Sequence, residues 1–197
     1  MLDRKTLLVK QRGAFLKLVD TFEIDIYDPA TGAQIGLARE RVSRWLKVLR
    51  HLIRPRIFPT LVEVRERDDG PVILSIWRGV TLLRSNVIVR NRVGRELGRF
   101  KSKVFSLGGG FHVLDALGNP VAEIKGDWKG WNFRILAVDG SGSELGKVTK
   151  KWTGRGKELL TSPDNYVIAL AESHPLPPDA TSLFLAAGLA IDIVYKK

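Results

Sequence analysis

Residues 183–195 read LFLAAGLAIDIVY, and this stretch decides the fold. With Asp179, or alternatively Thr181 or Ser182, as the N-cap, it predicts a helix from about Asp179 to Tyr195. Apolar side chains cover every face of this helix, whereas a helix on a protein surface has one polar face. We therefore expect the rest of the protein to surround it.

A membrane-spanning role for this stretch is not expected. Residues 180–191 are uncharged, but Asp192 then interrupts them, and a spanning helix needs roughly 20 apolar residues. A buried charge is costly without a partner. We expect Asp192 to meet a Lys or Arg of the surrounding wall, or to be exposed at the mouth of the barrel.

The chain before this helix repeats one pattern. A short alternating segment leads through a turn with Asp or Asn and Gly into a second apolar segment, which is typical of a β-hairpin. The paired segments are residues 22–26 and 35–37, 61–64 and 72–74, 87–89 and 97–98, 111–113 and 121–124, and 133–135 and 145–148. Residues 7–9 and 166–170 are candidates for two further strands.

Successive hairpins with few helices between them indicate an antiparallel barrel or sandwich. The enclosed C-terminal helix favours the barrel. The predicted fold class is mostly β (α+β), a closed antiparallel barrel around a buried apolar helix, and no linker divides residues 1–197, which we expect to be a single domain.

Residues 41–54 break the β pattern and predict an additional amphipathic helix. One face is apolar and includes Trp45, whereas the other carries Arg44, Lys47, Arg50 and Arg54. Such a helix is typical of attachment to an anionic membrane. The alternative is that the apolar face packs on the barrel wall and the cations are simply in water.

The formal net charge of +11 is the one unusual bulk property. It favours anionic partners, although solubility alone explains it equally well. A second basic cluster includes Lys147, Lys150 and Lys151, and a third lies within residues 90–103. Because alternate residues of a strand share a face, part of each cluster could form a phosphate-binding surface.

Residues for catalysis or cofactor binding do not emerge. Without cysteine, the chain has no thiolate chemistry and no cysteine-ligated metal site, which suits a reducing cytosol. The three histidines share no metal-binding spacing. Residues 140–147 are glycine-rich but lack the spacing of a phosphate loop, so we interpret them as a hairpin turn. We expect no catalytic residue, no metal and no cofactor.

Several late motifs carry a family resemblance. They are FHVLD at residues 111–115 with Gly118, GDW at 126–128 with WNF at 131–133, GKVTKKW at 146–152, DNY at 164–166, and the closing apolar stretch. In this order they resemble the tubby-like superfamily, and within it the phospholipid scramblase and LURP-one-related families. The resemblance covers nearly the whole chain and implies a closed barrel of about twelve antiparallel strands around an apolar C-terminal helix.

The departures from the family matter for function. The Pro-rich N-terminal region and cysteine-rich palmitoylation segment of animal scramblases are absent. In the family's proposed calcium segment, Ser162 replaces the first acid and leaves Asp164 as a weak calcium candidate, whereas Ca²⁺ takes six to eight oxygen ligands.

These observations predict a non-enzymatic module that binds anionic phospholipid through a basic surface. The resemblance to phosphoinositide-binding tubby domains implies phosphoinositide headgroups as ligands. The predicted lipid-binding residues are Arg44, Lys47, Arg50, Arg54, Lys147, Lys150 and Lys151. The expected location is cytoplasmic, with peripheral membrane attachment. The alternatives are a nucleic-acid-binding domain, which the low aromatic content disfavours, and a protein-interaction scaffold.

Overall fold

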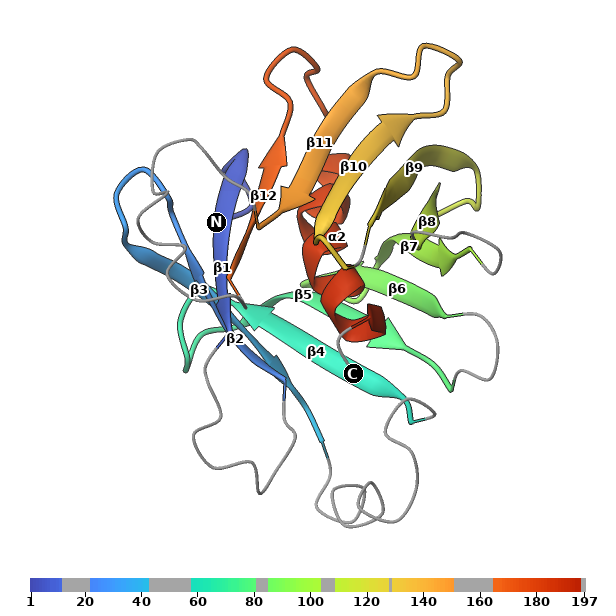
Figure 1. Ribbon diagram of the computed structural model, residues 1–197. Helices are drawn as coiled ribbons and strands as arrows, with labels where there is room; N and C mark the ends of the chain where they lie inside the picture. The colour runs from blue at the N-terminus through green and yellow to red at the C-terminus, as the bar shows by residue number, and fades with distance from the viewer. Residues whose placement is uncertain are drawn as a thin grey trace.

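In the computed structural model, a ring of strands surrounds one helix (Figure 1). The structure describes residues 1–11, 22–42, 58–80, 85–103, 109–127, 129–150 and 165–195. The strands are β1 (Thr6–Gln11), β2 (Glu23–Tyr27), β3 (Gln34–Glu40), β4 (Thr60–Arg65), β5 (Val72–Arg78), β6 (Asn86–Asn91), β7 (Glu96–Ser102), β8 (Gly110–Asp115), β9 (Pro120–Asp127), β10 (Asn132–Ala137), β11 (Glu144–Thr149) and β12 (Tyr166–Leu170). The helix is α2 (Pro178–Tyr195).

The strands form a closed antiparallel barrel with the simplest topology. Each strand pairs with its neighbours in sequence, and β1 closes the ring by pairing with β12, for example Leu7 with Ile168. Closure leaves no exposed sheet edge, which an open sheet of this size would have to protect. The predicted hairpins, both extra strands and the closed barrel are therefore confirmed.

Two of the hairpin turns show how the sequence sets the register. In the turn after β6, the Asn91 side chain accepts hydrogen bonds from the amides of Val93 and Arg95, and Gly94 adopts a φ of +81°. The turn after β8 repeats this geometry with Asp115 as the acceptor and Gly118 at φ +92°. These left-handed positions favour glycine, which explains the spacing of Asn or Asp and Gly in the sequence.

Helix α2 fills the barrel, as predicted. Its buried residues run from Ser182 to Ile193, and they pack mainly against β12 and β7. At Gly188 the helix comes so close to β12 that an added Cβ would lie 2.6 Å from Ile168. The predicted N-cap was wrong, because the helix begins at Pro178 and Asp179 in its first turn instead binds Arg95 at 2.8 Å.

Within the described residues α2 is the only helix, and the helix predicted at 41–54 is not seen. Most of that prediction, residues 43–57, lies outside the described residues. Arg41 and Val42 are described and are not helical. The Arg41 amide donates to the Leu61 carbonyl at 2.8 Å, so the pairing of β3 with β4 continues where the helix was expected to begin.

The antiparallel order sorts the segments between strands into two sets. The turn end is formed by residues 1–5, 28–33, 66–71, 92–95, 116–119, 138–143 and 171–177, and all of them are described. At the opposite end, the described residues outside the strands are 22, 41–42, 58–59, 79–80, 85, 103, 109, 129–131, 150 and 165. At the turn end, the β10–β11 hairpin and the segment between β12 and α2 lie together at the top of Figure 1.

Candidate functional site: a row of cations on the barrel wall

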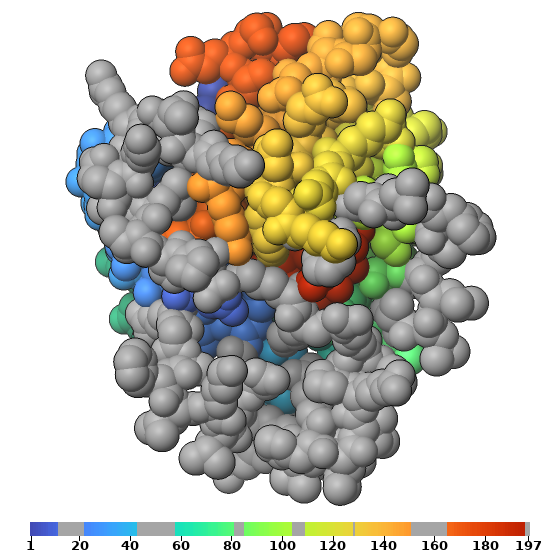
Figure 2. Space-filling model, viewed as in Figure 1, coloured from blue at the N-terminus to red at the C-terminus, as the bar shows by residue number. Residues whose placement is uncertain are grey.

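Three cations form a row across the outer surface of β9, β10 and β11. The register pairs Lys125 with Arg134, and Arg134 with Lys147. Their neighbours in each strand, such as Ile124 and Phe133, are fully buried, so the cations point outward. Lys125 and Arg134 are exposed and Lys147 is half-buried. These strands form the yellow-to-orange area in the upper part of Figure 2. We call these three residues the cation row.

The cation row is only partly neutralised by nearby carboxylates. Lys125 Nζ lies 2.8 Å from Glu123 Oε2, and Glu123 also contacts Lys103. Arg134 forms no ion pair within the described part of the chain. Burial lowers the pKa of the Lys103 ammonium, and the nearby charge of Lys125 lowers it further. Because like charges directly across strands are unfavourable, barrel stability does not explain this arrangement.

A second wall, formed by β3 and β4, places its arginines beside carboxylates. Arg41 and Arg65 both bind Glu63, at 3.1 and 2.8 Å, and Arg39 pairs with Asp68. The hydrogen bond from Arg65 is the main cause of the lowered pKa of Glu63, and Arg41 adds to it. The positive charge of this wall is therefore compensated within the protein.

The structure separates two of the predicted lipid-binding lysines. Lys147 belongs to the cation row. Lys150 instead lies at the opposite end of the barrel, where its Nζ is 4.9 Å from the centre of the buried Trp131 ring. Arg44, Lys47, Arg50, Arg54, Lys151 and the calcium candidate Asp164 lie outside the described residues.

The third basic cluster is also divided. Arg95 binds Asp179, Arg99 binds Glu96 at 2.6 Å, and Lys103 contacts Glu123, so three of its cations have acidic partners. Lys125 and Arg134 were not predicted from the sequence, because each is a single cation within its own strand. Only the cross-strand register brings them beside Lys147. Aligning the two strands of each predicted hairpin would have revealed this pairing from the sequence.

The two ends of the barrel differ in charge. The turn end carries seven carboxylates, which are Asp3, Asp28, Glu66, Asp68, Asp69, Asp139 and Glu172. It carries five Lys and Arg side chains, which are Arg4, Lys5, Arg67, Arg92 and Arg95, and the Met1 ammonium, which binds Glu66. Among side chains, five against seven leaves −2 in a chain of +11, so the positive charge is carried by the rest of the molecule.

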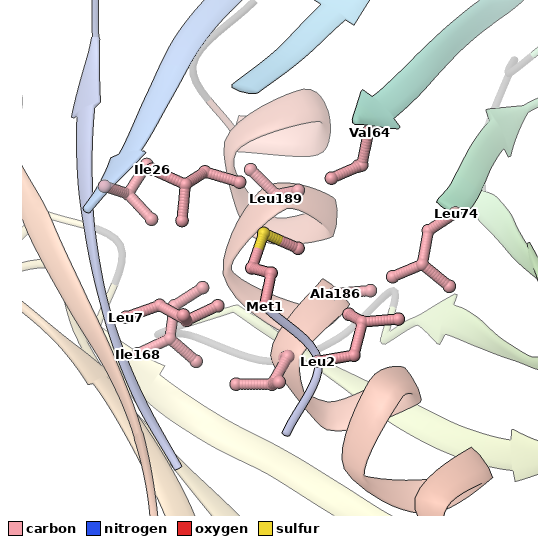
Figure 3. A pocket seen from close by; sticks show the side chains of 11 residues that line it. Met1, Leu2, Leu7, Ile26, Val64, Leu74, Ile168, Ala186 and Leu189 are labelled. Carbon is pink, nitrogen blue, oxygen red and sulfur yellow. The ribbon is translucent and has the colours of Figure 1, made fainter. Parts of the chain in front are cut away.

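The interior offers no room for a lipid chain between α2 and the first five strands. A cavity there, lined by apolar side chains that include Met1, Val64 and Leu189, measures about 10 Å³ (Figure 3). This is about the space that one water molecule needs. A headgroup or acyl chain would therefore have to bind outside this part of the barrel.

Polar groups hold the C-terminal part of α2. Buried Arg78 of β5 donates from Nη1 to the Ile193 carbonyl at 2.8 Å, and this cation favours the helix C-terminus. Asp192 is fully buried and not exposed at the mouth of the barrel. It lies near Tyr166, whose pKa is raised well above its usual value by burial first and by the Asp192 charge second.

Two further properties bear on membrane and metal binding. By length and composition alone, α2 could cross a membrane, but 67% of this helix is buried in the barrel, and core helices of soluble proteins can be equally long and apolar. Among the described residues, no group of three His, Asp or Glu side chains could hold a metal ion.

Comparison with known proteins identifies the family. Residues 1–197 match the family described as Scramblase. Neither the curated proteins nor the solved structures gave a match. Membership in this family implies an association with membrane lipids. The matched region includes every strand of the barrel, the central helix and the cation row, and the chain belongs to the Scramblase family.

Proposed function

We propose that this protein is a non-enzymatic module that binds anionic phospholipid headgroups, phosphoinositides among them, on the outer surface of its barrel. The cation row is the observation that carries the proposal. Lys125, Arg134 and Lys147 lie side by side across three strands, and Arg134 has no acidic partner within the described residues.

The spacing of the row suits phosphate groups. Neighbouring strands lie about 4.8 Å apart, so adjacent cations are close enough to contact the same phosphate or two phosphates of one headgroup. A guanidinium binds phosphate through two parallel hydrogen bonds, whereas an ammonium acts as a point charge. Arg134 at the centre of the row therefore supplies the directional contact, and the two lysines supply charge on either side.

The proposed location is cytoplasmic and peripheral at the membrane. The net charge of +11 and family membership support attachment from the aqueous side of an anionic surface. We retain Arg44, Lys47, Arg50, Arg54 and Lys151 as proposed contributors on the basis of the sequence alone. Lys150 is a weaker contributor, because its ammonium lies over Trp131.

The proposal is tested by co-sedimentation with vesicles of phosphatidylcholine, alone or mixed with phosphatidylserine or a phosphoinositide. Arg134→Gln is compared with Arg92→Gln, which removes the same charge from an exposed arginine of the turn end. At about 1 kcal/mol per cation near an anionic surface, Arg134→Gln should weaken binding about fivefold. Arg92→Gln should bind like the wild type.

Two outcomes would contradict the proposal. Equal losses in the two variants would mean that net charge, and not the row, determines binding. No sedimentation of the wild type with anionic vesicles at moderate salt would exclude the lipid function. A separate arm with the four changes Arg44→Glu, Lys47→Glu, Arg50→Glu and Arg54→Glu tests the contribution of residues 41–54.

A further inference from the structure

The turn end is the acidic end of a strongly basic protein. Its Lys, Arg, Asp and Glu side chains sum to −2, whereas those of the whole chain sum to +11. At the opposite end, the described residues between strands include the cations Arg41, Lys103, Lys129 and Lys150 and no carboxylate. Among the described residues between strands, the side-chain charge is therefore negative at the turn end and positive at the opposite end.

Charged residues near the cation row also change from mostly acidic on the turn-end side to mostly basic on the opposite side. On the turn-end side of the row, Glu123 and Glu144 occupy β9 and β11. On the opposite side lie Lys129 and Lys150, together with one carboxylate, Asp127. The oxygens of Asp127 accept hydrogen bonds from the amides of Lys129 and Gly130, which partly satisfy its charge.

The turn end also exposes apolar side chains, which argue for the reverse orientation. Val93, Leu117 and Val138 lie in or beside three successive turns at exposures of 75%, 87% and 43%. On their own, such tips would favour insertion into a membrane interface. However, Leu117 is two residues from Asp115, and Val138 adjoins Asp139.

Hydrogen bonds favour the ionised form of both of these carboxylates. A hydrogen bond from the Asn119 side chain lowers the pKa of Asp115, and one from the Ser141 side chain lowers the pKa of Asp139. An anionic surface therefore repels these tips at neutral pH, and protonation cannot readily relieve the repulsion.

We infer that the barrel binds an anionic membrane with its turn end facing away from the lipid and its opposite end facing toward it. This orientation rests on the proposed lipid-binding function. In it, the exposed tips and the start of α2 point into the aqueous phase, where they remain accessible while the protein is bound.

The absence of cysteine makes the orientation directly measurable. Val80→Cys, at the opposite end, and Leu117→Cys, at the turn end, replace apolar residues that are 66% and 87% exposed. Each variant is labelled with an environment-sensitive fluorophore and mixed with phosphatidylcholine–phosphatidylserine vesicles that contain a quencher in the acyl chains. The same samples are sedimented to score binding separately, and Val93→Cys provides a second reporter for the turn end.

Quenching at Val80→Cys, with fluorescence unchanged at Leu117→Cys and Val93→Cys, is the expected result. Sedimentation with quenching at the turn end, at both ends or at neither would overturn the orientation and leave lipid binding intact. If the labelled proteins and the unlabelled wild type all fail to sediment, the proposed function itself is contradicted.

Discussion

The β9–β11 wall and the β3–β4 wall carry the same kinds of charged side chains in opposite arrangements. On β3 and β4 the signs alternate, because Arg39 lies directly across from Glu63 and Glu23. On β9, β10 and β11 one sign repeats through Lys125, Arg134 and Lys147. Alternating signs stabilise a sheet and like signs destabilise it. The first wall therefore satisfies its own charges, whereas the second keeps Arg134 without an acidic partner among the described residues.

The largest expected effect compares Gly110 of β8, which pairs with Lys125 beside the β9–β11 wall, with Gly36 on the β3–β4 wall. An added Cβ at Gly110 of β8 would lie 2.3 Å from the Ile124 carbonyl oxygen, at a φ of +146°. At Gly36 of β3, the nearest atom is the Met1 sulfur, at 2.5 Å, which belongs to a flexible side chain. We expect Gly110→Ala to lower the free energy of unfolding by about 3 kcal/mol and Gly36→Ala by about 1 kcal/mol.

Urea denaturation of the two alanine variants measures this difference. Equal destabilisation would show that the backbone of β8 adjusts to an added Cβ as easily as that of β3. The backbone beside the cation row would then not be rigid. If Gly110→Ala folds, its binding to anionic vesicles should also fall, because the strain lies directly across from Lys125.

The next effect separates the two walls by function. Changing Lys125, Arg134 and Lys147 together to Gln should weaken binding to phosphatidylserine vesicles roughly a hundredfold, at about 1 kcal/mol for each cation. Changing Arg39, Arg41 and Arg65 together to Gln removes the same charge and should weaken binding only slightly. Vesicle titration, with urea denaturation of both variants, checks the prediction.

The two triple variants should rank in the opposite order in stability, as measured by the urea concentration at which they unfold. The variant that lacks the β9–β11 cations loses like-charge repulsion and should unfold at the same or a higher urea concentration than the wild type. The variant that lacks the β3–β4 arginines leaves Glu63 without its partners and should unfold earlier. Parallel losses of binding in the two variants would contradict the distinction between the walls.

The smallest effect is the pH dependence of stability that Glu63 contributes on the β3–β4 wall. Because Arg65 and Arg41 hold the pKa of Glu63 below its usual value of 4.5, the pair stabilises the folded state fully above about pH 4.5. This contribution is lost as the pH falls through the lowered pKa. In Arg65→Gln the pKa of Glu63 should rise, as followed by its carboxyl carbon in an NMR titration. An unchanged pKa would show that the Arg65 pair is not formed in solution.

The sequence predicts the barrel better than it predicts the site. Alternating residues, Asn or Asp with Gly in turns, and the apolar stretch at 183–195 are local signals, and each leads to a strand, a turn or the core helix. The cation row depends on which residues face each other across strands, which a reading along one strand does not show. Lys147 and Lys150 look like one cluster in sequence. Lys147 points outward from β11, whereas Lys150, just after the strand ends, lies over Trp131.

The contact made by Asp179 at the start of α2 was likewise not predictable from local sequence. Asp179 has the residue type of an N-cap, but Pro177 and Pro178 place the helix start earlier, because proline suits the first turn. The carboxylate then binds Arg95 from the β6–β7 turn, a contact between residues that are distant in sequence.

The most direct test of the central claim is an NMR titration of the ¹⁵N-labelled protein with a soluble inositol phosphate, which presents the headgroup without a membrane. We expect the largest amide shifts on β9, β10 and β11 around Lys125, Arg134 and Lys147, and we expect them to disappear in the variant with Gln at these positions. Shifts centred on the β3–β4 arginines, or no saturable shifts in the wild type, would contradict this expectation.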